Sequence, residues 1–130
     1  MPTAEAFEVL AVVLDAQADE LEVVMAPVWP IVDAEVMAGG VLREDLLDRL
    51  DDDAGWLRVE TGLLRDAADE CRRRAAVCRA AEHAALAHAA ALLRYERDLA
   101  DWLQSDTSGA CGPRPQRPSP PARPPSWAAW

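Results

Sequence analysis

Two histidines in the stretch AEHAALAHAA are the first candidates for chemistry, because imidazole nitrogens are common metal ligands. His83 and His88 are five residues apart. On a helix this spacing separates them by about 140°, so they do not share a face. The sequence also contains no His-Glu-x-x-His motif. We interpret both as structural or surface histidines and expect neither a metal site nor a cofactor.

Three cysteines, Cys71, Cys78 and Cys111, offer redox chemistry. Their number and positions do not make a disulfide framework. Cys71 and Cys78 share a helix face but lie two turns apart, on the order of 10 Å, which is too far for a disulfide within one helix. The spacing favours small core residues, and a disulfide across a dimer or a redox role is the alternative. We expect Cys111 to be an exposed thiol in the tail.

Two charge clusters are candidates for ion binding. CRRRAAVCR carries Arg72, Arg73, Arg74 and Arg79, which favours a solvated or salt-bridged helix face over a phosphate or nucleic-acid patch. DDDAG, at residues 51–55, lacks the alternating ligands of a calcium loop and is typical of a turn and helix cap. No nucleophile–base set and no glycine-rich phosphate loop stands out, so we do not expect an enzyme.

The chain ends in PSPPARPPSWAAW, and seven of its ten prolines lie in residues 113–125. Such a segment is typical of a solvated, polyproline-type, disordered tail. Its terminal tryptophans, Trp127 and Trp130, are predicted to anchor a docking motif with Arg117 and Arg123 at its rim, since aromatic anchors supply much of the energy at interfaces. The alternative is that the tail folds back and packs the tryptophans on the helices.

The composition favours an all-α protein, because Ala and Leu dominate its apolar residues and both are good helix formers. Residues 1–70 hold eighteen acids against four arginines, and residues 71–130 hold five against nine. A net charge of −10 argues against general nucleic-acid binding. The start carries acids where a signal peptide has basic residues, and the longest apolar run is too short to span a bilayer. We expect a chain that is cytoplasmic, or secreted without a cleaved signal peptide, and not inserted in a membrane.

The elements that position these residues are predicted to be two helical arms. Thr3 can cap the first helix, and Pro27 and Pro30 predict that it stops near Met25. A short helical stretch is expected at 31–37. The first arm shows a heptad seam, with Phe7, Leu14, Leu21 and Val28 in one position and Leu10, Gln17 and Val24 in the other.

The second arm is predicted to be one long helix over residues 55–104, after a turn at 51–54 that Gly55 and Trp56 follow. Seven positions at a spacing of seven form its seam for a partner helix: Leu57, Leu64, Cys71, Cys78, Ala85, Leu92 and Leu99. The two arms therefore predict an antiparallel helical hairpin domain at 1–104 and a flexible tail at 105–130.

This arrangement resembles the actinobacterial WXG-type and ESX-associated substrates of type VII secretion systems. The residues that carry the resemblance are AGW (Ala54, Gly55 and Trp56) and YERDLADW (Tyr95 to Trp102). The family's turn reads Trp-x-Gly, whereas Gly55 precedes Trp56 here. The family's export signal has an acid four residues after the Tyr, where this chain has Leu99 and places the acid at Asp98. The resemblance implies a bundle of two hairpins, an export signal at Tyr95, Asp98 and Trp102, and a tail that engages a secretion ATPase.

Three hypotheses follow. The first is a non-enzymatic helical hairpin that pairs with another hairpin and is a substrate or accessory factor of type VII secretion. The second is a cytoplasmic, homodimeric coiled-coil adaptor that presents the tail to a partner. The third is an acidic mimic that uses residues 1–70 to block a basic surface, with binding that weakens steeply with salt.

Overall fold

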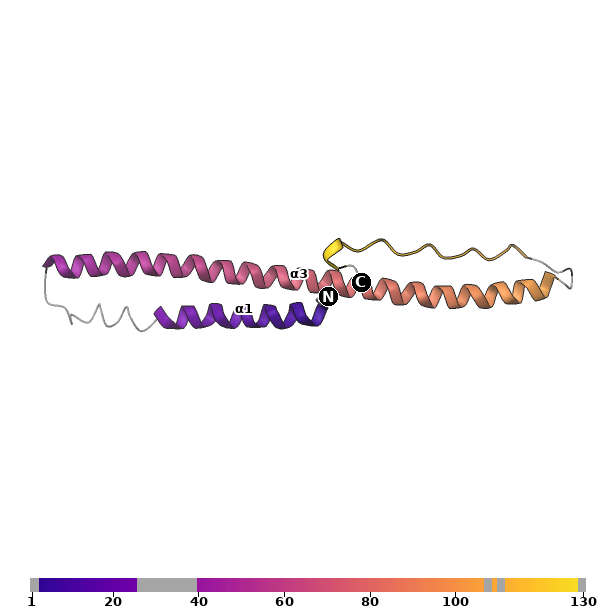
Figure 1. Cartoon of the computed structure of the whole chain (residues 1–130), viewed down its shortest axis with the longest axis horizontal. Coiled ribbons are helices and arrows are strands. Elements are labelled where there is room, and N and C mark those ends of the chain that lie inside the picture. Colours follow the sequence, from indigo (N-terminus) through magenta and orange to yellow (C-terminus); the bar gives the residue numbers. More distant parts are fainter. Residues whose placement is uncertain (1–2, 26–39, 107–108, 110–111, 129–130) are drawn as a thin grey trace. The chain divides into compact units, whose positions relative to one another are not determined.

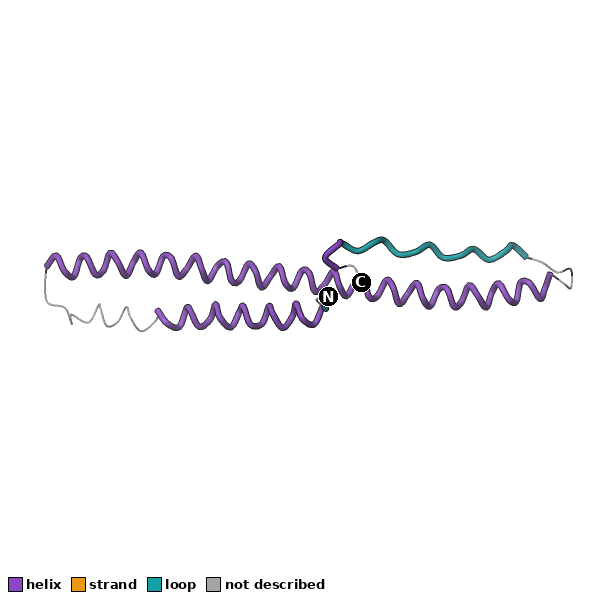
Figure 2. Tube along the Cα trace, viewed as in Figure 1, coloured by secondary structure: helices purple, strands orange, loops and turns teal. Residues whose placement is uncertain are grey.

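Two long helices make up most of the fold. A computed structural model describes residues 3–25, 40–106, 109 and 112–128 (Figure 1). Helix α1 runs over Ala4–Met25, helix α3 over Gly40–Asp106, and a short 3₁₀ helix, η1, over Ser126–Ala128. The described residues contain no strand, so the predicted all-α helical hairpin is confirmed (Figure 2). The helical stretch predicted at 31–37 lies outside the described residues.

Helix α1 begins and ends where the sequence predicts. The hydroxyl oxygen of Thr3 accepts a hydrogen bond from the amide of Ala6 at 3.2 Å, and its carbonyl accepts one from the amide of Phe7 at 3.2 Å. These bonds satisfy amides that have no partner within the first turn of a helix. The last residue of α1 is Met25, and the two prolines beyond it lie outside the described residues.

The turn predicted at 51–54 is wrong, because these residues, together with Gly55 and Trp56, are inside α3. An apolar stripe passes through the segment without interruption. Leu47, Leu50, Ala54 and Leu57 follow one another at spacings of three, four and three residues, and all four are buried or half-buried. A continuous stripe of this kind favours helix over the local turn chemistry of three aspartates. The connection between the hairpin's helices is therefore residues 26–39, which lie outside the described residues.

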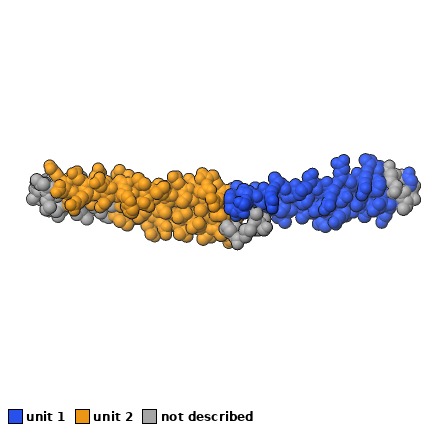
Figure 3. All heavy atoms as spheres, turned by 45° about the horizontal axis from the view of Figure 1, so that its top comes forward, with its two compact units in different colours: residues 1, 76–130 blue, residues 2–75 orange. Residues whose placement is uncertain are grey.

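The chain divides into two compact units, residues 2–75 (unit 2) and residue 1 with 76–130 (unit 1), shown in Figure 3. In unit 2, α1 packs antiparallel to the first part of α3. The buried apolar residues of this unit are all small: Ala4, Ala11, Ala18, Ala54, Ala68, Cys71 and Ala75. Ala11, Ala68 and Cys71 form the central cluster, and Phe7 and Leu14 pack against it. Small side chains at the contact let two helices approach closely.

One half of the seam predicted for the first arm is on the packed side of α1, and the other half is not. Phe7, Leu14 and Leu21 are half-buried, as expected. The companion positions predicted at Leu10, Gln17 and Val24 are exposed and do not pack against α3, so a neighbouring helix at these positions stays a prediction. Their place is taken by Ala4, Ala11 and Ala18. A seven-residue repeat allows a companion three residues to either side, and the alanine side gives the closer contact between helices.

The seam predicted on α3 is covered over most of its length. Its members divide into buried Cys71 and Cys78, half-buried Leu57, Leu64, Leu92 and Leu99, and exposed Ala85. Thr61 also lies in this stripe and is buried, with its hydroxyl donating to the carbonyl oxygen of Leu57 at 2.8 Å. This bond satisfies the one polar side chain that is buried among the described residues.

In unit 1 the neighbour of α3 is the proline-rich tail. After Gly112 the tail runs back along the helix and ends at η1 (Figures 1 and 2). Ala128, in η1, is buried at 6% exposure. The segment between Gly112 and η1 has neither helix nor strand structure, in keeping with residues that lack backbone donors.

Candidate interaction surfaces

The outer side of α1 carries an apolar surface that the fold leaves uncovered. Six of its large apolar side chains are between 46% and 69% exposed: Val9, Leu10, Val12, Val13, Val23 and Val24. We call these six residues the outer face of α1. They lie on the side of the helix opposite Ala11 and Ala18, so α1 is apolar on two sides. Two of these six residues, Leu10 and Val24, belong to the seam predicted from the sequence, and the other four were not predicted.

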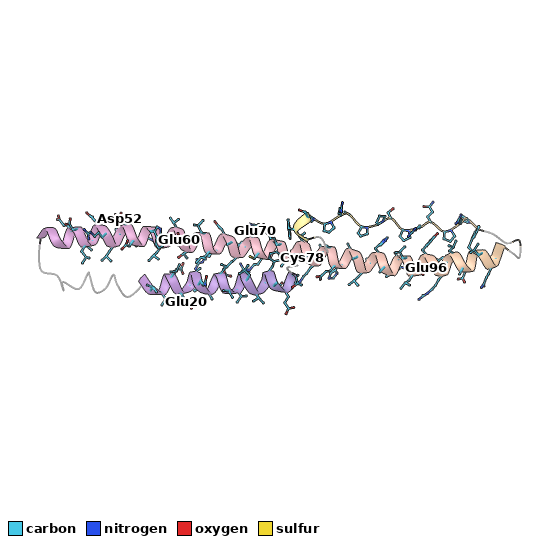
Figure 4. The ribbon with its side chains drawn as sticks, viewed as in Figure 1. Glu20, Asp52, Glu60, Glu70, Cys78 and Glu96 are labelled. Atoms are coloured by element: carbon cyan, nitrogen blue, oxygen red, sulfur yellow. The ribbon has the colours of Figure 1, made fainter. Side chains whose placement is uncertain are left out.

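Helix α1 is acidic, with six acidic residues and no basic one. Asp15, Asp19 and Glu22 face α3, where Arg72 pairs with Asp15, and Arg65 pairs with Glu22 at 2.9 Å and Asp19 at 3.4 Å. Glu20 instead points away from α3 (Figure 4). It precedes Val23 and Val24 by three and four residues and so lies within the outer face. A helix that covers the outer face would therefore meet the Glu20 carboxylate.

A second exposed apolar group occupies unit 2, on α3. Trp56, Val59 and Leu63 are 63%, 60% and 57% exposed. Their spacing of three and four residues places them on one side of the helix. Trp56, predicted at a turn, is thus a helical residue on an open surface. No added Cβ at neighbouring Gly55 or Gly62 would meet an atom within 4 Å.

In unit 1, α3 has an exposed apolar stripe of its own. Leu86, Leu93 and Leu103 are 71%, 58% and 53% exposed. Leu86 and Leu93 are seven residues apart and share one side of the helix. Charged residues of both signs are exposed on the same part of α3: Arg79, Arg94, Arg97, Glu96, Asp98 and Asp101. The surroundings of this apolar stripe are therefore mixed in charge, unlike the wholly acidic α1.

The predicted export-signal residues differ in how far they are exposed. Tyr95 and Trp102 are half-buried, whereas Asp98 is exposed. The indole N–H of Trp102 donates a hydrogen bond to the carbonyl oxygen of Gly112 at 2.8 Å, which connects the end of α3 to the start of the tail. The two aromatic residues and the acid are therefore not presented together on one open surface.

The tail residues predicted to dock are spread along the part of the tail that follows Gly112. Trp127 is half-buried within η1, and Arg117 and Arg123 are exposed. Trp130 and Cys111 lie outside the described residues. The described tail thus has the arrangement of the fold-back alternative, and docking on a partner stays a prediction.

The arginine cluster has its partners within the chain. Arg72 pairs with Asp15 and with Asp69, while Arg74 and Arg73 both pair with Glu70 at 2.9 Å and 3.0 Å. Hydrogen bonds from Arg74 and then Arg73 hold the pKa of the Glu70 carboxyl below its ordinary value. Hydrogen bonds first to Asp15 and then to Asp69 raise the pKa of Arg72. A salt-bridged helix face explains these charges without a phosphate ligand.

The residues considered first for chemistry are not assembled into a reactive site. His83 is exposed and His88 half-buried, and Cys71 and Cys78 are buried free thiols. Within the described residues no group of three His, Cys, Asp or Glu side chains is placed to hold a metal ion. Neither described helix has a stretch of the length and hydrophobicity that crossing a membrane requires.

No protein-family model matches this sequence, and comparison with curated proteins and with solved structures gave no significant similarity. The type VII resemblance therefore rests on the residues quoted above.

Proposed function

We propose that this chain is a non-enzymatic interaction protein whose hairpin, formed by α1 and the first part of α3, pairs with a second helical hairpin. The observation that carries the proposal is the outer face of α1. A partner helix laid on this face would bury apolar side chains that the chain alone leaves in water. Apolar residues at helical spacing suit a helix as the partner.

The thin core of unit 2 supports the same proposal. Its buried apolar residues are alanines and one cysteine, and such side chains bury little apolar area on folding. A two-helix hairpin of this kind has a small core for its length. Adding two helices would enclose the outer face of α1 in a four-helix bundle.

Charge narrows the choice of partner. Two copies of α1 packed on each other through their outer faces would place two Glu20 carboxylates in one interface, and like charges oppose association. We therefore propose that the partner helix has basic residues beside its apolar stripe, as a different hairpin protein can provide.

The test is to capture the tagged full chain from its native host, purify the co-captured hairpin, and reconstitute the pair. Val13→Gln with Val24→Gln should weaken the purified complex about tenfold or more, since each valine would lose buried apolar area. The control is Val59→Gln, a valine on α3 that is 60% exposed, against 46% for Val13 and 61% for Val24, and it should leave affinity unchanged. Equal affinity for all three chains would show that the outer face of α1 is not the interface.

A second candidate is self-association, favoured by the exposed Leu86 and Leu93 on α3. One copy's α1 can pack its outer face on this stripe of another copy, so that apolar side chains of both are removed from water. The chain would then be a homodimeric adaptor that presents its tail. Sedimentation of the purified chain separates the candidates: a stable oligomer supports the adaptor, and a monomer that is stabilised only by a different hairpin supports the first proposal.

We also propose that the chain is a substrate or accessory factor of type VII secretion, with Tyr95, Asp98 and Trp102 as a degenerate export signal and the tail contacting the secretion ATPase. The family resemblance supports this assignment. Comparing culture medium and cell extract, in hosts with and without the secretion ATPase, tests it. Export that depends on the ATPase and is lost in Tyr95→Ala is the expected result, and retention in the cytosol with the machinery intact would contradict it.

A further inference from the structure

The tail of unit 1 shows a three-residue repeat. Prolines occupy positions 115, 118, 121 and 124, and Trp127 continues the series. A polyproline-type helix has three residues per turn, so residues at this spacing lie on one side of it. In the structure Pro115, Pro118, Pro124 and Trp127 are half-buried, whereas Pro121 and the residues between these positions are exposed. Burial therefore follows the repeat at four of its five positions.

The helix carries a matching stripe. His88, Leu92, Tyr95, Leu99 and Trp102 are half-buried, and the spacing between them alternates between four and three residues. We call these five residues the tail-binding face of α3. Three residues of a polyproline helix rise about 9.3 Å, and seven residues of an α-helix rise about 10.5 Å. The two repeats are thus close in length, so the tail can offer one apolar residue to each heptad of the helix. The tail-binding face spans two heptads, about 21 Å, and therefore matches two of the four repeats between Pro115 and Trp127, which span about 37 Å.

A hydrogen bond attaches the start of the tail to α3: the indole of Trp102 donates to the carbonyl of Gly112 at 2.8 Å. Prolines have no amide donor, so the repeated prolines can hold to the helix through packing of their rings. Packing of prolines on an apolar and aromatic stripe is how aromatic surfaces recognise proline-rich segments in general.

We propose that the tail-binding face of α3 is a recognition surface for proline-rich segments of a partner protein, and that residues 112–128 are its internal ligand. The partner segment is a polyproline-type strand with an apolar residue at every third position. It binds by displacing the tail, which exposes Trp127 and the face that includes Tyr95 and Trp102. The proposal concerns unit 1 alone and does not depend on what covers the outer face of α1.

The experiment measures binding of a fluorescent synthetic peptide with the sequence of residues 113–128 to the full chain by fluorescence anisotropy. Pro118→Ala with Pro124→Ala, in the chain, removes two half-buried prolines from the internal ligand. The matched control is Pro113→Ala with Pro120→Ala, which removes two exposed prolines and lowers polyproline propensity equally. Weakening the internal competitor raises the fraction of free surface, so the first variant should bind the peptide about tenfold more tightly than wild type. The control should bind like wild type.

A second arm of the experiment uses one protein throughout and varies the peptide. Peptides carrying the same two pairs of substitutions are titrated into the Pro118→Ala, Pro124→Ala chain, whose helix content is checked by circular dichroism. The peptide altered at 118 and 124 should bind about tenfold more weakly than the peptide altered at 113 and 120. Equal affinity of the two peptides, equal affinity of the three chains, or no binding to any chain would overturn the proposal. A wild-type chain that sediments as a dimer, and becomes a monomer only in Pro118→Ala, Pro124→Ala, would assign the face to a second copy's tail instead.

Discussion

The carboxylate of Glu22 and the guanidinium of Arg65 lie 2.9 Å apart and connect the end of α1 to α3. Seven residues further along α3, Arg72 pairs with Asp15, which is seven residues earlier in α1. Equal steps of seven residues in opposite directions are expected when two helices pack antiparallel, and they give one charged contact for each heptad. The acids of α1 and the arginines of α3 thus help to set how the two helices of unit 2 are aligned.

Reversing the charge at Arg65 should destabilise unit 2. Arg65→Glu would place a carboxylate beside Asp19 and Glu22, and we expect a loss of about 0.5–1 kcal/mol, because the groups are largely exposed. Thermal unfolding followed by circular dichroism measures the change, and Arg58→Glu, an exposed site on the same helix, is the control. In 1 M salt the Debye length falls to about 3 Å, so exposed charges are screened from each other. The difference in stability between the two variants should therefore become smaller. A difference that salt does not reduce would argue against an electrostatic origin.

Enlarging an alanine at the helix contact should be costly. Ala18 is fully buried, and Ala18→Leu would force the helices apart, with an expected loss of about 1–3 kcal/mol. Ala16 is exposed on the same helix, so Ala16→Leu should change stability by less than about 0.5 kcal/mol. Chemical denaturation of both variants makes the comparison. Similar stabilities would mean that α1 does not pack through its alanines.

Replacing Gly55 tests the course of α3 through the segment that resembles a turn. An added Cβ there would meet no atom within 4 Å, so Gly55→Ala should stabilise the helix by about 0.8–1 kcal/mol. Gly62→Ala, at a second open helical position, should have the same effect. If residues 51–55 formed a turn with a left-handed glycine, Gly55→Ala would instead destabilise the protein while Gly62→Ala would not.

The stabilising contribution of Glu70 should depend on pH. Because Arg74 and Arg73 lower the pKa of this carboxyl in the folded chain, folding favours its ionised form. That contribution is present at neutral pH and is lost as pH falls through the lowered pKa, below the ordinary value of about 4.3. Wild type should therefore melt above Glu70→Gln at pH 7, and the two melting temperatures should converge in acid. A difference in melting temperature that stays constant with pH would mean that the charge of Glu70 is not its cause.

The helical class and the local limits of α1 follow from the amino-acid sequence alone. Thr3 supplies a hydroxyl for the first turn, and two prolines after Met25 prevent a regular helix, so both ends of α1 follow from local chemistry. The half-buried line of Phe7, Leu14 and Leu21 also follows from spacing alone, because a heptad repeat defines one side of a helix.

The residues that complete the packed side of α1 are selected by its contact with α3. Ala11 and Leu10 flank the heptad line as alternative companions, and hydrophobicity favours Leu10 while close packing against α3 selects Ala11. Aspartates 51–53 are compatible with both a turn and a helix, and the apolar stripe on either side of them selects the helix. The prolines of the tail exclude hydrogen-bonded structure but not packing, so the sequence predicted an extended segment without showing what it would contact. That contact depends on α3 presenting a stripe whose heptad rise is close to the rise of three polyproline residues, and this match exists only when both segments are folded.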